Sequence, residues 1–265
     1  MRWIPVALMI ILGAGRAAGD VSRSHSHNDY LQPRPLATAL EARMGSVEVD
    51  VWLKAGELLV AHAEAETVVG RTLRSLYLEP LRLHLKARAG SVYPEGSPLV
   101  LLIDIKSEAE ATYQAVESVL AEYRDMITEF RDGRVTERAV TVLISGNVPK
   151  ATLLGQAFRL AAADGRPGDL ETDPPVAAVP VISTNWRSFF SWDGLGSMPV
   201  DEKHALRQWV ERCHAQGRKV RLWAAPDTET AWREQADAGV DFINTDQPAA
   251  LHAFLVSYRG PTGVK

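Results

Sequence analysis

The feature that most constrains the fold is an alternation of short β-branched runs with longer amphipathic stretches, which continues along almost the whole chain. The β-branched runs predict strands at 24–27, 47–53, 99–105, 140–144, 179–182, 219–223 and 241–244. The amphipathic stretches predict helices at 35–44, 72–86, 108–130, 200–216, 228–238 and 248–257. Such an alternation is typical of βα units around a parallel sheet. Because the length also suits eight of these units, we expect a (β/α)8 TIM-type barrel, although fewer than eight strands are evident.

Two stretches do not fit this alternation. Residues 165–180 (GRPGDLETDPPVAAVP) are rich in Pro, Gly and acids, and we expect a loop that holds one short strand. Residues 185–199 are too long for a plain connection and carry four aromatic side chains, Trp186, Phe189, Phe190 and Trp192. Long loops of this kind are often lids or binding walls. A hydrophobic cluster packed beneath a loop is an equal alternative.

The N-terminus has the layout of a secretory signal peptide. Arg2 precedes the apolar run Val6–Leu12, and small residues at 17–19 precede the first polar segment. The apolar run is shorter than the roughly 20 residues that a membrane-spanning helix needs. We therefore expect the protein to be secreted or periplasmic, residues 1–19 to be removed on export, and residues 20–265 to form a single barrel domain. The alternative is that the N-terminus remains as an uncleaved membrane anchor.

Charge and cysteine content exclude several classes of protein. The 29 Lys and Arg residues against 33 Asp and Glu residues give a net charge of −4, so the chain lacks the basic surface of a nucleic-acid-binding protein. The single cysteine, Cys213, excludes an internal disulfide framework and a Cys-rich zinc module. Nothing in the sequence indicates an obligate protein partner.

Acidic residues interrupt two of the predicted buried strands. Glu48 and Asp50 lie in VEVDVWL, where their i, i+2 spacing directs both carboxylates to the same side. Asp104 repeats the pattern in LVLLIDIK, with Lys106 on the same side. Adjacent buried carboxylates repel each other and lose hydration, so they need a counter-charge. One divalent cation, Mg²⁺ or Ca²⁺, would supply it, because these ions prefer oxygen ligands; Lys106 would add a second cation for an anionic substrate.

Two histidines lie where predicted strands end. His27 stands in SHSHNDY, and His62 follows the run LLVA. Barrel enzymes gather their catalytic groups at the carboxyl ends of the strands. Imidazole titrates near neutrality, so the pair predicts a general base and a general acid, with the individual roles open. His25 shares the face of His27 and is the alternative to it.

Each of these motifs also has a purely structural interpretation. A lone E-x-D is more often an ion pair or a strand edge than a metal site, and a lone D-x-K is more often a salt bridge. A histidine at a strand end is usually a polar cap or a solvated residue. The functional interpretation depends on the joint occurrence of His, E-x-D, His and D-x-K, in that order, on successive βα units.

This order of motifs resembles the superfamily that unites glycerophosphodiester phosphodiesterases, phosphatidylinositol-specific phospholipases C and spider-type sphingomyelinases D. GSVEVDVWLKAGELLVAH resembles the family's second strand, where E-x-D leads through a short hairpin to a His. SHNDYL is similar to the S-H-N-T-Y-L motif of phospholipase C, which implies a catalytic His27 and a metal-ligating Asn28. LLIDIK resembles the strand with the third ligand, in its sphingomyelinase D form. KVRLWA, followed by AGVDFINTDQP, resembles the phosphodiesterase C-terminus and places Trp223 at the mouth of the site.

A fuller resemblance, which covers nearly the whole mature chain, is to the subgroup named for altered inheritance of mitochondria. It rests on HNDY, VEVDVWL and RTLRSLYLEPL. Two positions depart from the glycerophosphodiesterase motifs. Asn28 and Asp29 replace the Arg and Gly of H-R-G, which removes a phosphate-binding arginine. Ala63 follows His62 in place of the usual Asp, so His62 lacks its usual orienting partner.

The resemblance implies a metal-dependent phosphoric diester hydrolase that acts on a glycerophosphodiester or phospholipid-type substrate, with transient contact to a membrane surface. The implied site consists of metal ligands, two proton-transfer groups, a cation and a substrate-binding aromatic residue: Asn28, Glu48, Asp50 and Asp104; His27 and His62; Lys106; and Trp223. The aromatic loop at 186–192 would help Trp223 to hold an apolar or choline-like part of the substrate. The alternative function is an exported lipid- or headgroup-binding barrel that has kept the site but lost turnover.

Overall fold

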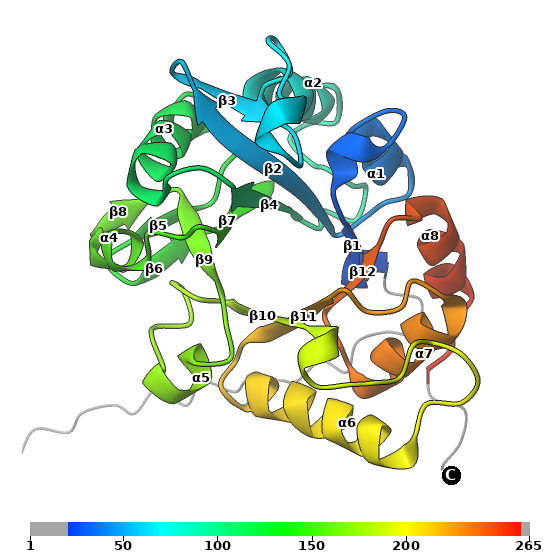
Figure 1. Ribbon diagram of the computed structural model, residues 1–265. Coiled ribbons are helices and arrows are strands. Elements are labelled where there is room, and N and C mark those ends of the chain that lie inside the picture. The colour runs from blue at the N-terminus through cyan, green and yellow to red at the C-terminus, as the bar shows by residue number, and fades with distance from the viewer. Residues whose placement is uncertain (1–20, 261–265) are drawn as a thin grey trace, which may run out of the picture.

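A closed ring of eight parallel strands forms the centre of the computed structural model, which describes residues 21–260 (Figure 1). In ring order the strands are β1 (Ser24–Ser26), β2 (Ser46–Lys54), β4 (Leu99–Ile105), β7 (Val140–Gly146), β9 (Ala161–Gly165), β10 (Val181–Asn185), β11 (Lys219–Trp223) and β12 (Phe242–Thr245). β1 pairs with both β12 and β2, which closes the ring. β3 (Glu57–Val60) runs antiparallel to β2 as a hairpin. The predicted (β/α)8 TIM-type barrel is confirmed.

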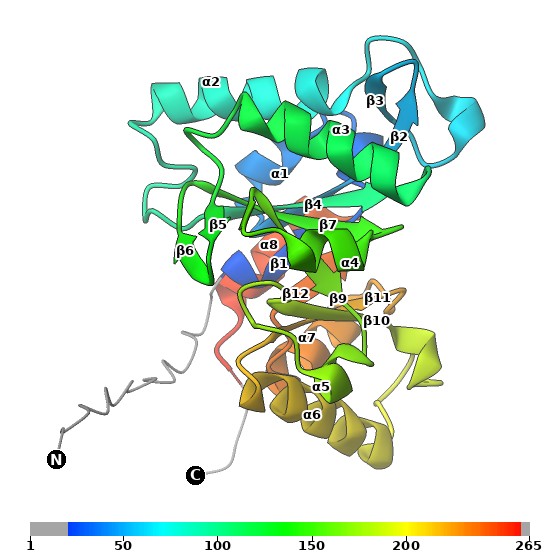
Figure 2. The same cartoon turned by 90° about the vertical axis from the view of Figure 1, so that its left-hand side faces the viewer.

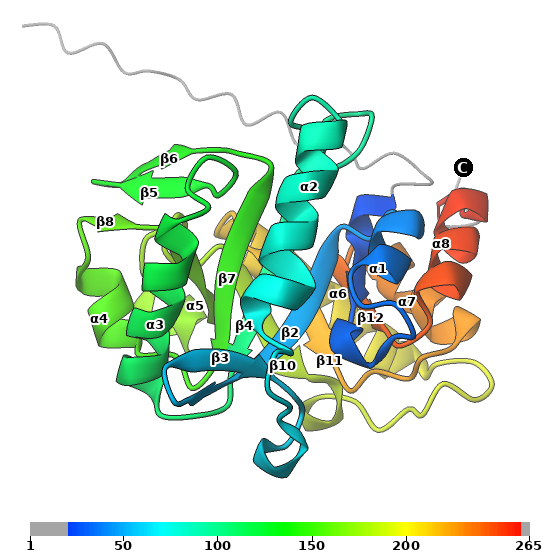
Figure 3. The same cartoon turned by 90° about the horizontal axis from the view of Figure 1, so that it is seen from above.

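Helices surround this ring on the outside (Figures 1 and 2). They are α1 (Ala37–Glu41), α2 (Glu79–Ala87), α3 (Ala109–Ala121), α4 (Lys150–Gly155), α5 (Asp169–Thr172), α6 (Val200–Ala215), α7 (Glu229–Ala238) and α8 (Pro248–Ser257). A π-helical turn (Arg74–Leu78) leads into α2, and short 3-10 turns cover Val21–Arg23, Asp29–Leu31, Glu64–Glu66 and Trp186–Ser188. Viewed from above, α2 lies in front of β2 and β4, between α3 and α1 (Figure 3).

The alternation of side chains along the strands divides the buried interior into two parts. Val47, Val49 and Val51 of β2 belong to the large core cluster between the strands and the helices. The alternate residues of each strand point into the barrel, where a second, smaller apolar cluster is formed by Leu102, Phe130, Leu143, Ala162, Val181 and Phe242. On β4, Leu102 belongs to this inner cluster, and Asp104 lies two residues closer to the carboxyl end. The barrel interior therefore changes from apolar to polar towards the carboxyl ends of its strands.

One barrel strand was missing from the sequence-based expectation, and a neighbouring strand is displaced. β9 has the sequence AAADG, which lacks the β-branched residues that mark the other strands, and pairing with β7 and β10 fixes it in the ring. The strand expected at 179–182 runs instead over Val181–Asn185. The loop expected at 165–180 contains the short helix α5 rather than a strand.

The long helix expected at 108–130 was wrong in its second half. The helix α3 ends at Ala121, and the chain then forms β5 (Glu129–Arg131), which pairs with β6 (Arg134–Thr136) and β8 (Phe158–Arg159) in a small separate sheet. Asp132 and Gly133 connect β5 to β6 with positive φ angles of 50° and 75°. An Asp-Gly pair in this conformation is the favoured two-residue hairpin turn, and it was the signal against a continuous helix.

The aromatic loop after β10 packs into the core, as the alternative interpretation expected. Trp186, Phe190 and Trp192 are buried, and the rings of Trp186 and Phe190 lie 4.4 Å apart. Phe189 is 47% exposed, but its ring packs on Trp209 of α6, 5.1 Å away. Three of the four aromatic side chains are therefore enclosed in the hydrophobic core, and the expectation that this loop holds substrate was wrong for them.

The expected signal peptide at 1–19 lies outside the described residues, and export therefore stays a prediction. Within residues 21–260, no helix is both long enough and apolar enough to cross a bilayer.

Candidate active site

A pocket of about 260 Å³ opens at the carboxyl ends of the barrel strands, the edge where this fold carries its active sites. Seven of the eight predicted site residues line it, together with three others: His27, Asn28, Glu48, His62, Asp104, Lys106 and Trp223, with Ser145, Arg166 and Arg221. The eighth predicted residue, Asp50, is fully buried and directly contacts two of the lining side chains, His62 and Lys106.

The three predicted carboxylates converge inside the barrel. Glu48, Asp50 and Asp104 each offer an oxygen, and these oxygens all lie within 4.8 Å of one another. Parallel pairing of β2 with β4 places Asp50 opposite Asp104. Burial raises the pKa of both residues, that of Asp104 to about 6, although the charge of Lys106 acts in the opposite direction. The cluster is therefore short of positive charge.

Lys106 lies between two of these carboxylates. Its Nζ atom is 3.2 Å from Oδ2 of Asp50 and 3.1 Å from Oδ1 of Asp104. Burial acts to lower the pKa of Lys106, but the charges of Asp104 and Asp50 outweigh it and raise the pKa. The ammonium group is thus held charged at the wall of the pocket.

Two donors hold Glu48 from the other side. His25 Nε2 lies 2.9 Å from Glu48 Oε2, and Arg221 Nη2 donates to the same oxygen at 2.5 Å. Burial and the charge of Arg221 lower the pKa of His25 to about 4, so its imidazole is neutral at pH 7. Burial acts to raise the pKa of Glu48, but Arg221 and the hydrogen bond from His25 outweigh it and keep the carboxylate ionised. His25 is therefore a buried partner of Glu48, and His27 is the histidine at the pocket.

The donor set fits one hard divalent cation. Oδ1 of Asp50 is buried and has no hydrogen-bond partner within residues 21–260. Both donors to Glu48 contact Oε2, which leaves Oε1 for another ligand. An unpartnered buried carboxylate oxygen is costly, and Mg²⁺ or Ca²⁺ binds such oxygens. Asn28, whose Oδ1 lies 3.2 Å from the Tyr30 hydroxyl, adds a neutral oxygen at the pocket wall.

Carboxylates orient both candidate proton-transfer groups. His27 Nδ1 is 2.8 Å from Oδ1 of Asp246, the Asp of the TDQP motif. Burial lowers the pKa of His27, but the bond to Asp246 and the charge of Glu48 outweigh it, so the net shift is upward. His62 Nδ1 lies 3.2 Å from Oδ2 of Asp50. Asp50 thus replaces the Asp that the sequence lacks after His62.

A buried aspartate fixes the turn that carries His27 and Asn28. Asp29 accepts hydrogen bonds from the Ser26 hydroxyl at 2.9 Å, the Tyr77 hydroxyl at 3.0 Å and the Leu36 backbone N–H at 2.5 Å. A carboxylate with three donors restrains the chain on both sides of it. Asp29 therefore holds His27 and Asn28 in position but does not itself line the pocket.

Sequence reasoning missed two arginines of the pocket. Arg221 lies in the middle of β11, and Arg166 follows β9, the strand that was not recognised. Arg166 Nη1 donates to Oδ2 of the buried Asp164 at 2.8 Å, and its Nη2 donates to the Ser145 hydroxyl at 3.1 Å. A charged residue inside the β-branched run KVRLW was the same signal that revealed Glu48, and it would have identified Arg221.

Trp223 is the aromatic residue that reaches the pocket. It ends β11, is 38% exposed and lines the cavity with His27 and Arg221. An exposed indole at the rim suits contact with an apolar or cationic group.

Gly146 provides a direct test of the carboxylate cluster. A Cβ atom on Gly146 would lie 2.1 Å from Asp104 Oδ1 and 2.5 Å from the carbonyl oxygen of Ile105, and the residue has φ of +69°. We expect Gly146→Ala to displace the Asp104 carboxylate and weaken Mg²⁺ binding by at least about tenfold, as measured by isothermal titration calorimetry, because ligand geometry sets the affinity for this ion.

The matched control is Gly56→Ala, which has a φ of +83° and open space around the added carbon. It should lose stability from backbone strain, about 1 kcal/mol, and keep the Mg²⁺ affinity. Equal Mg²⁺ affinities in the two variants would contradict the role of Asp104.

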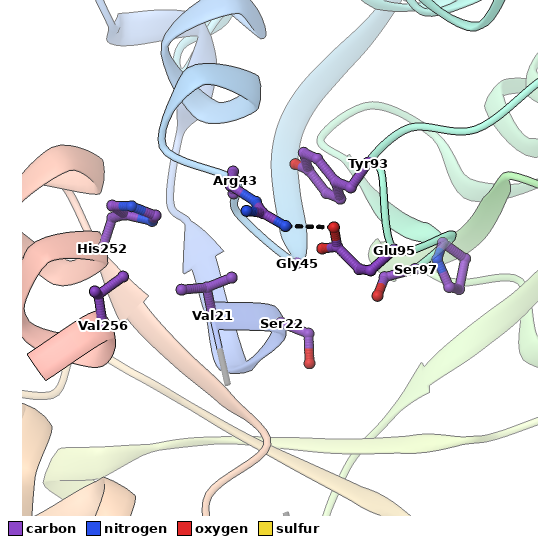
Figure 4. Close-up of a pocket in the computed structure, with 10 residues that line it drawn as sticks. Val21, Ser22, Arg43, Gly45, Tyr93, Glu95, Ser97, His252 and Val256 are labelled. Carbon is purple, nitrogen blue, oxygen red and sulfur yellow. Dashed lines mark hydrogen bonds and ion pairs between the residues drawn. The ribbon is translucent and has the colours of Figure 1, made fainter. Parts of the chain in front are cut away.

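A second cavity, of about 370 Å³, lies at the opposite end of the barrel, beside the segments that enter β1 and β2 (Figure 4). An ion pair between Arg43 and Glu95 spans it, and Tyr93 and His252 lie at its walls. In TIM-barrel enzymes, residues at this end of the barrel contribute to stability, whereas catalysis takes place at the other end. The pocket at the carboxyl ends is therefore the candidate active site.

Two segments of the chain match known protein families. Residues 18–159 match the AIM6-like phosphodiesterase domain, and residues 219–249 match the glycerophosphoryl diester phosphodiesterase family. Altered inheritance of mitochondria protein 6 from Eremothecium gossypii is 29% identical over 88% of this chain and 69% of that protein. Its homolog from Arthroderma benhamiae is 27% identical over 87% of this chain and 83% of that protein.

Two solved structures share the fold. A glycerophosphodiester phosphodiesterase from Agrobacterium tumefaciens superposes with a TM-score of 0.51 at 16% identity, covering 87% of this chain and 97% of that one. The phosphatidylinositol-specific phospholipase C from Listeria monocytogenes gives 0.51 at 10% identity, covering 90% and 94%. The two matched segments together include every strand that carries a predicted site residue. The chain belongs to the AIM6-like phosphodiesterase family.

Proposed function

We propose that this protein is a metal-dependent phosphoric diester hydrolase that acts on a glycerophosphodiester or phospholipid-type substrate. The family and the fold support phosphodiester hydrolysis. The observation that carries the proposal is the convergence of Glu48, Asp50 and Asp104 within 4.8 Å, in a pocket that also holds His27 and His62.

The carboxylates and Asn28 would hold the metal. When bound, a divalent cation would polarise a phosphoryl oxygen and stabilise the charge that develops on it. Other side chains hold the carboxylates that would bind this ion: His25 and Arg221 contact Glu48, and Lys106 contacts Asp50 and Asp104. Ligand carboxylates that are fixed by such outer contacts keep their orientation when the ion binds.

His27 and His62 would move protons. In each imidazole Nδ1 faces a carboxylate, so the proton that is exchanged with substrate is carried on Nε2. One histidine would take a proton from the attacking hydroxyl or water, and the other would give a proton to the leaving alkoxide. Lys106, which is charged and lies at the wall of the pocket, would contact the anionic substrate.

Hydrolysis of bis-p-nitrophenyl phosphate tests the proposal. We expect the purified protein to release p-nitrophenol, a chelator to abolish the reaction, and added Mg²⁺ or Ca²⁺ to restore it. The absorbance of p-nitrophenol measures all three steps. Turnover that is unchanged by exhaustive chelation would contradict the metal-dependent mechanism.

The same assay separates the hydrolase from a lipid- or headgroup-binding barrel without turnover. That alternative predicts metal-dependent binding of glycerophosphodiesters, measured by calorimetry, with no product. The orienting contacts of Asp246 with His27 and of Asp50 with His62 favour the hydrolase, because a binding protein needs no oriented imidazoles.

A further inference from the structure

The pocket that holds His27 and Asn28 also contains a buried arginine, Arg221, on β11. We propose that Arg221 binds the phosphate group of the substrate. The inference rests on the proposed function, because it assigns to Arg221 a contact with the phosphate group of the diester.

Arg221 is a fixed guanidinium in the pocket wall. It lies on β11, its side chain is 4% exposed, and it lines the cavity. Nη2 donates to Glu48 Oε2 at 2.5 Å, and Nε donates to Asn244 Oδ1 at 2.9 Å. Within residues 21–260 the third nitrogen, Nη1, has no hydrogen-bond partner. Two of its nitrogens therefore hold the group still, and the third remains available as a donor.

A phosphate oxygen is the acceptor that best suits this nitrogen. Arginine remains protonated in proteins, and its planar group forms strong, directed hydrogen bonds to phosphate oxygens. The pocket that Arg221 lines also holds the two imidazoles and Lys106, so a phosphate there would meet a guanidinium, an ammonium and both proton-transfer groups. The orientation of the Arg221 guanidinium is set before substrate binds, and this reduces the entropy lost on binding.

The charge of the cluster also fits a phosphodiester. Three carboxylates face two cations, Lys106 and Arg221, which leaves one negative charge. One divalent cation would turn this into one positive charge, which matches the single negative charge of a phosphodiester. Arg221 is thus required for the site to be positive once the ion is bound.

Arg166 is the other arginine of the pocket, and it is less suited to this task. Its Nη1 donates to the Asp164 carboxylate at 2.8 Å and to the Gly165 carbonyl at 2.9 Å, and its Nη2 donates to Ser145. Both arginines are paired with a carboxylate, but 45% of the Arg166 side chain is exposed, against 4% of the Arg221 side chain. Arg221 is both more enclosed and closer to the carboxylate cluster, through its bond to Glu48.

Inorganic phosphate serves as the probe, titrated into the Mg²⁺-loaded protein by calorimetry, because this measurement needs no turnover. We expect Arg221→Lys and Arg221→Met to raise the Kd for phosphate by about 10- to 100-fold, the effect of one lost hydrogen bond between charged groups. Arg221→Lys should lower the Mg²⁺ affinity far less than the phosphate affinity, because it retains the positive charge and His25 still donates to Glu48.

The matched control is Arg218→Lys. Arg218 is also a buried arginine, but it bonds to the Val179 and Pro174 carbonyls and to Asp173 before β11 begins. This variant should lower the Tm and leave the Kd for phosphate unchanged.

Phosphate binding by Arg221→Lys that equals the wild type would overturn the inference. A parallel loss of Mg²⁺ and phosphate affinity would also overturn it, because Arg221 would then act only through Glu48. Failure of the wild type to hydrolyse any diester, with phosphate binding still dependent on Arg221, would refute the proposed function and leave this contact established.

Discussion

Replacement of Glu48 by Gln and Asp50 by Asn in the same chain is expected to abolish Mg²⁺ binding and to lower kcat/KM by about a thousandfold or more. The metal ion contributes several kcal/mol to stabilisation of the transition state, and each 1.36 kcal/mol corresponds to a factor of ten in rate. The amides keep the size of the side chains but remove two of the three negative charges that would bind the ion. Calorimetry with Mg²⁺ and hydrolysis of bis-p-nitrophenyl phosphate measure the two effects.

The geometry explains why the two substitutions should act together. Glu48 is held by Arg221 and His25, and Asp50 by Lys106, so each carboxylate already has a cation beside it. After both substitutions Arg221 and Lys106 share one acid, Asp104, and the cluster repels a divalent ion. A single substitution would leave two acids against the two cations and would have a smaller effect on the affinity for Mg²⁺.

A charge-matched control separates this effect from the loss of net negative charge. Glu57→Gln with Asp125→Asn removes one Glu and one Asp that are exposed and lie away from the pocket. It should keep both the Mg²⁺ affinity and the kcat/KM of the wild type. Full activity in the Glu48→Gln, Asp50→Asn variant would refute the assignment of the metal ligands.

The centre of the site could be predicted because its residues contradict their surroundings. Glu48, Asp50 and Asp104 are acids in the otherwise apolar runs VEVDVWL and LVLLIDI, and parallel strand pairing forces such residues together once β2 and β4 are neighbours. The barrel itself followed from periodicity and length. Acids in apolar runs and the periodicity of the elements are both local features of the sequence, so they can be recognised without knowledge of the tertiary structure.

The remainder of the site depends on contacts between distant segments, and no local pattern specifies these. Asp246 orients His27 across 219 residues, and Arg221 reaches Glu48 across 173 residues. Arg166 was missed together with β9, since three alanines gave no sign of a strand that only its neighbours stabilise. Trp186 and Trp192 could not be placed either, because an aromatic loop looks the same whether it packs inward or faces a ligand.

Alanine substitution of either histidine, His27 or His62, is expected to lower kcat for hydrolysis of an alkyl phosphodiester by about 10²- to 10⁴-fold, the usual contribution of a general acid or base. Loss of the imidazole leaves the carboxylate cluster in place, so the Mg²⁺ affinity should change far less than kcat. His204→Ala on α6, an exposed histidine away from the pocket, is the control and should retain full activity. Wild-type turnover in His27→Ala would remove this residue from the mechanism.

The leaving group then distinguishes the two roles. A p-nitrophenolate leaves without protonation, whereas the alkoxide of a glycerol ester needs a proton from the general acid. The variant that lacks the acid should therefore retain more activity on the aryl diester than on an alkyl diester, and the variant that lacks the base should lose activity on both equally. Since Asp246 raises the pKa of His27 and Asp50 contacts His62, both imidazoles are oriented for either role. Equal losses of the two variants on both substrates would show that neither histidine protonates the leaving group, and the two-histidine mechanism would have to be abandoned.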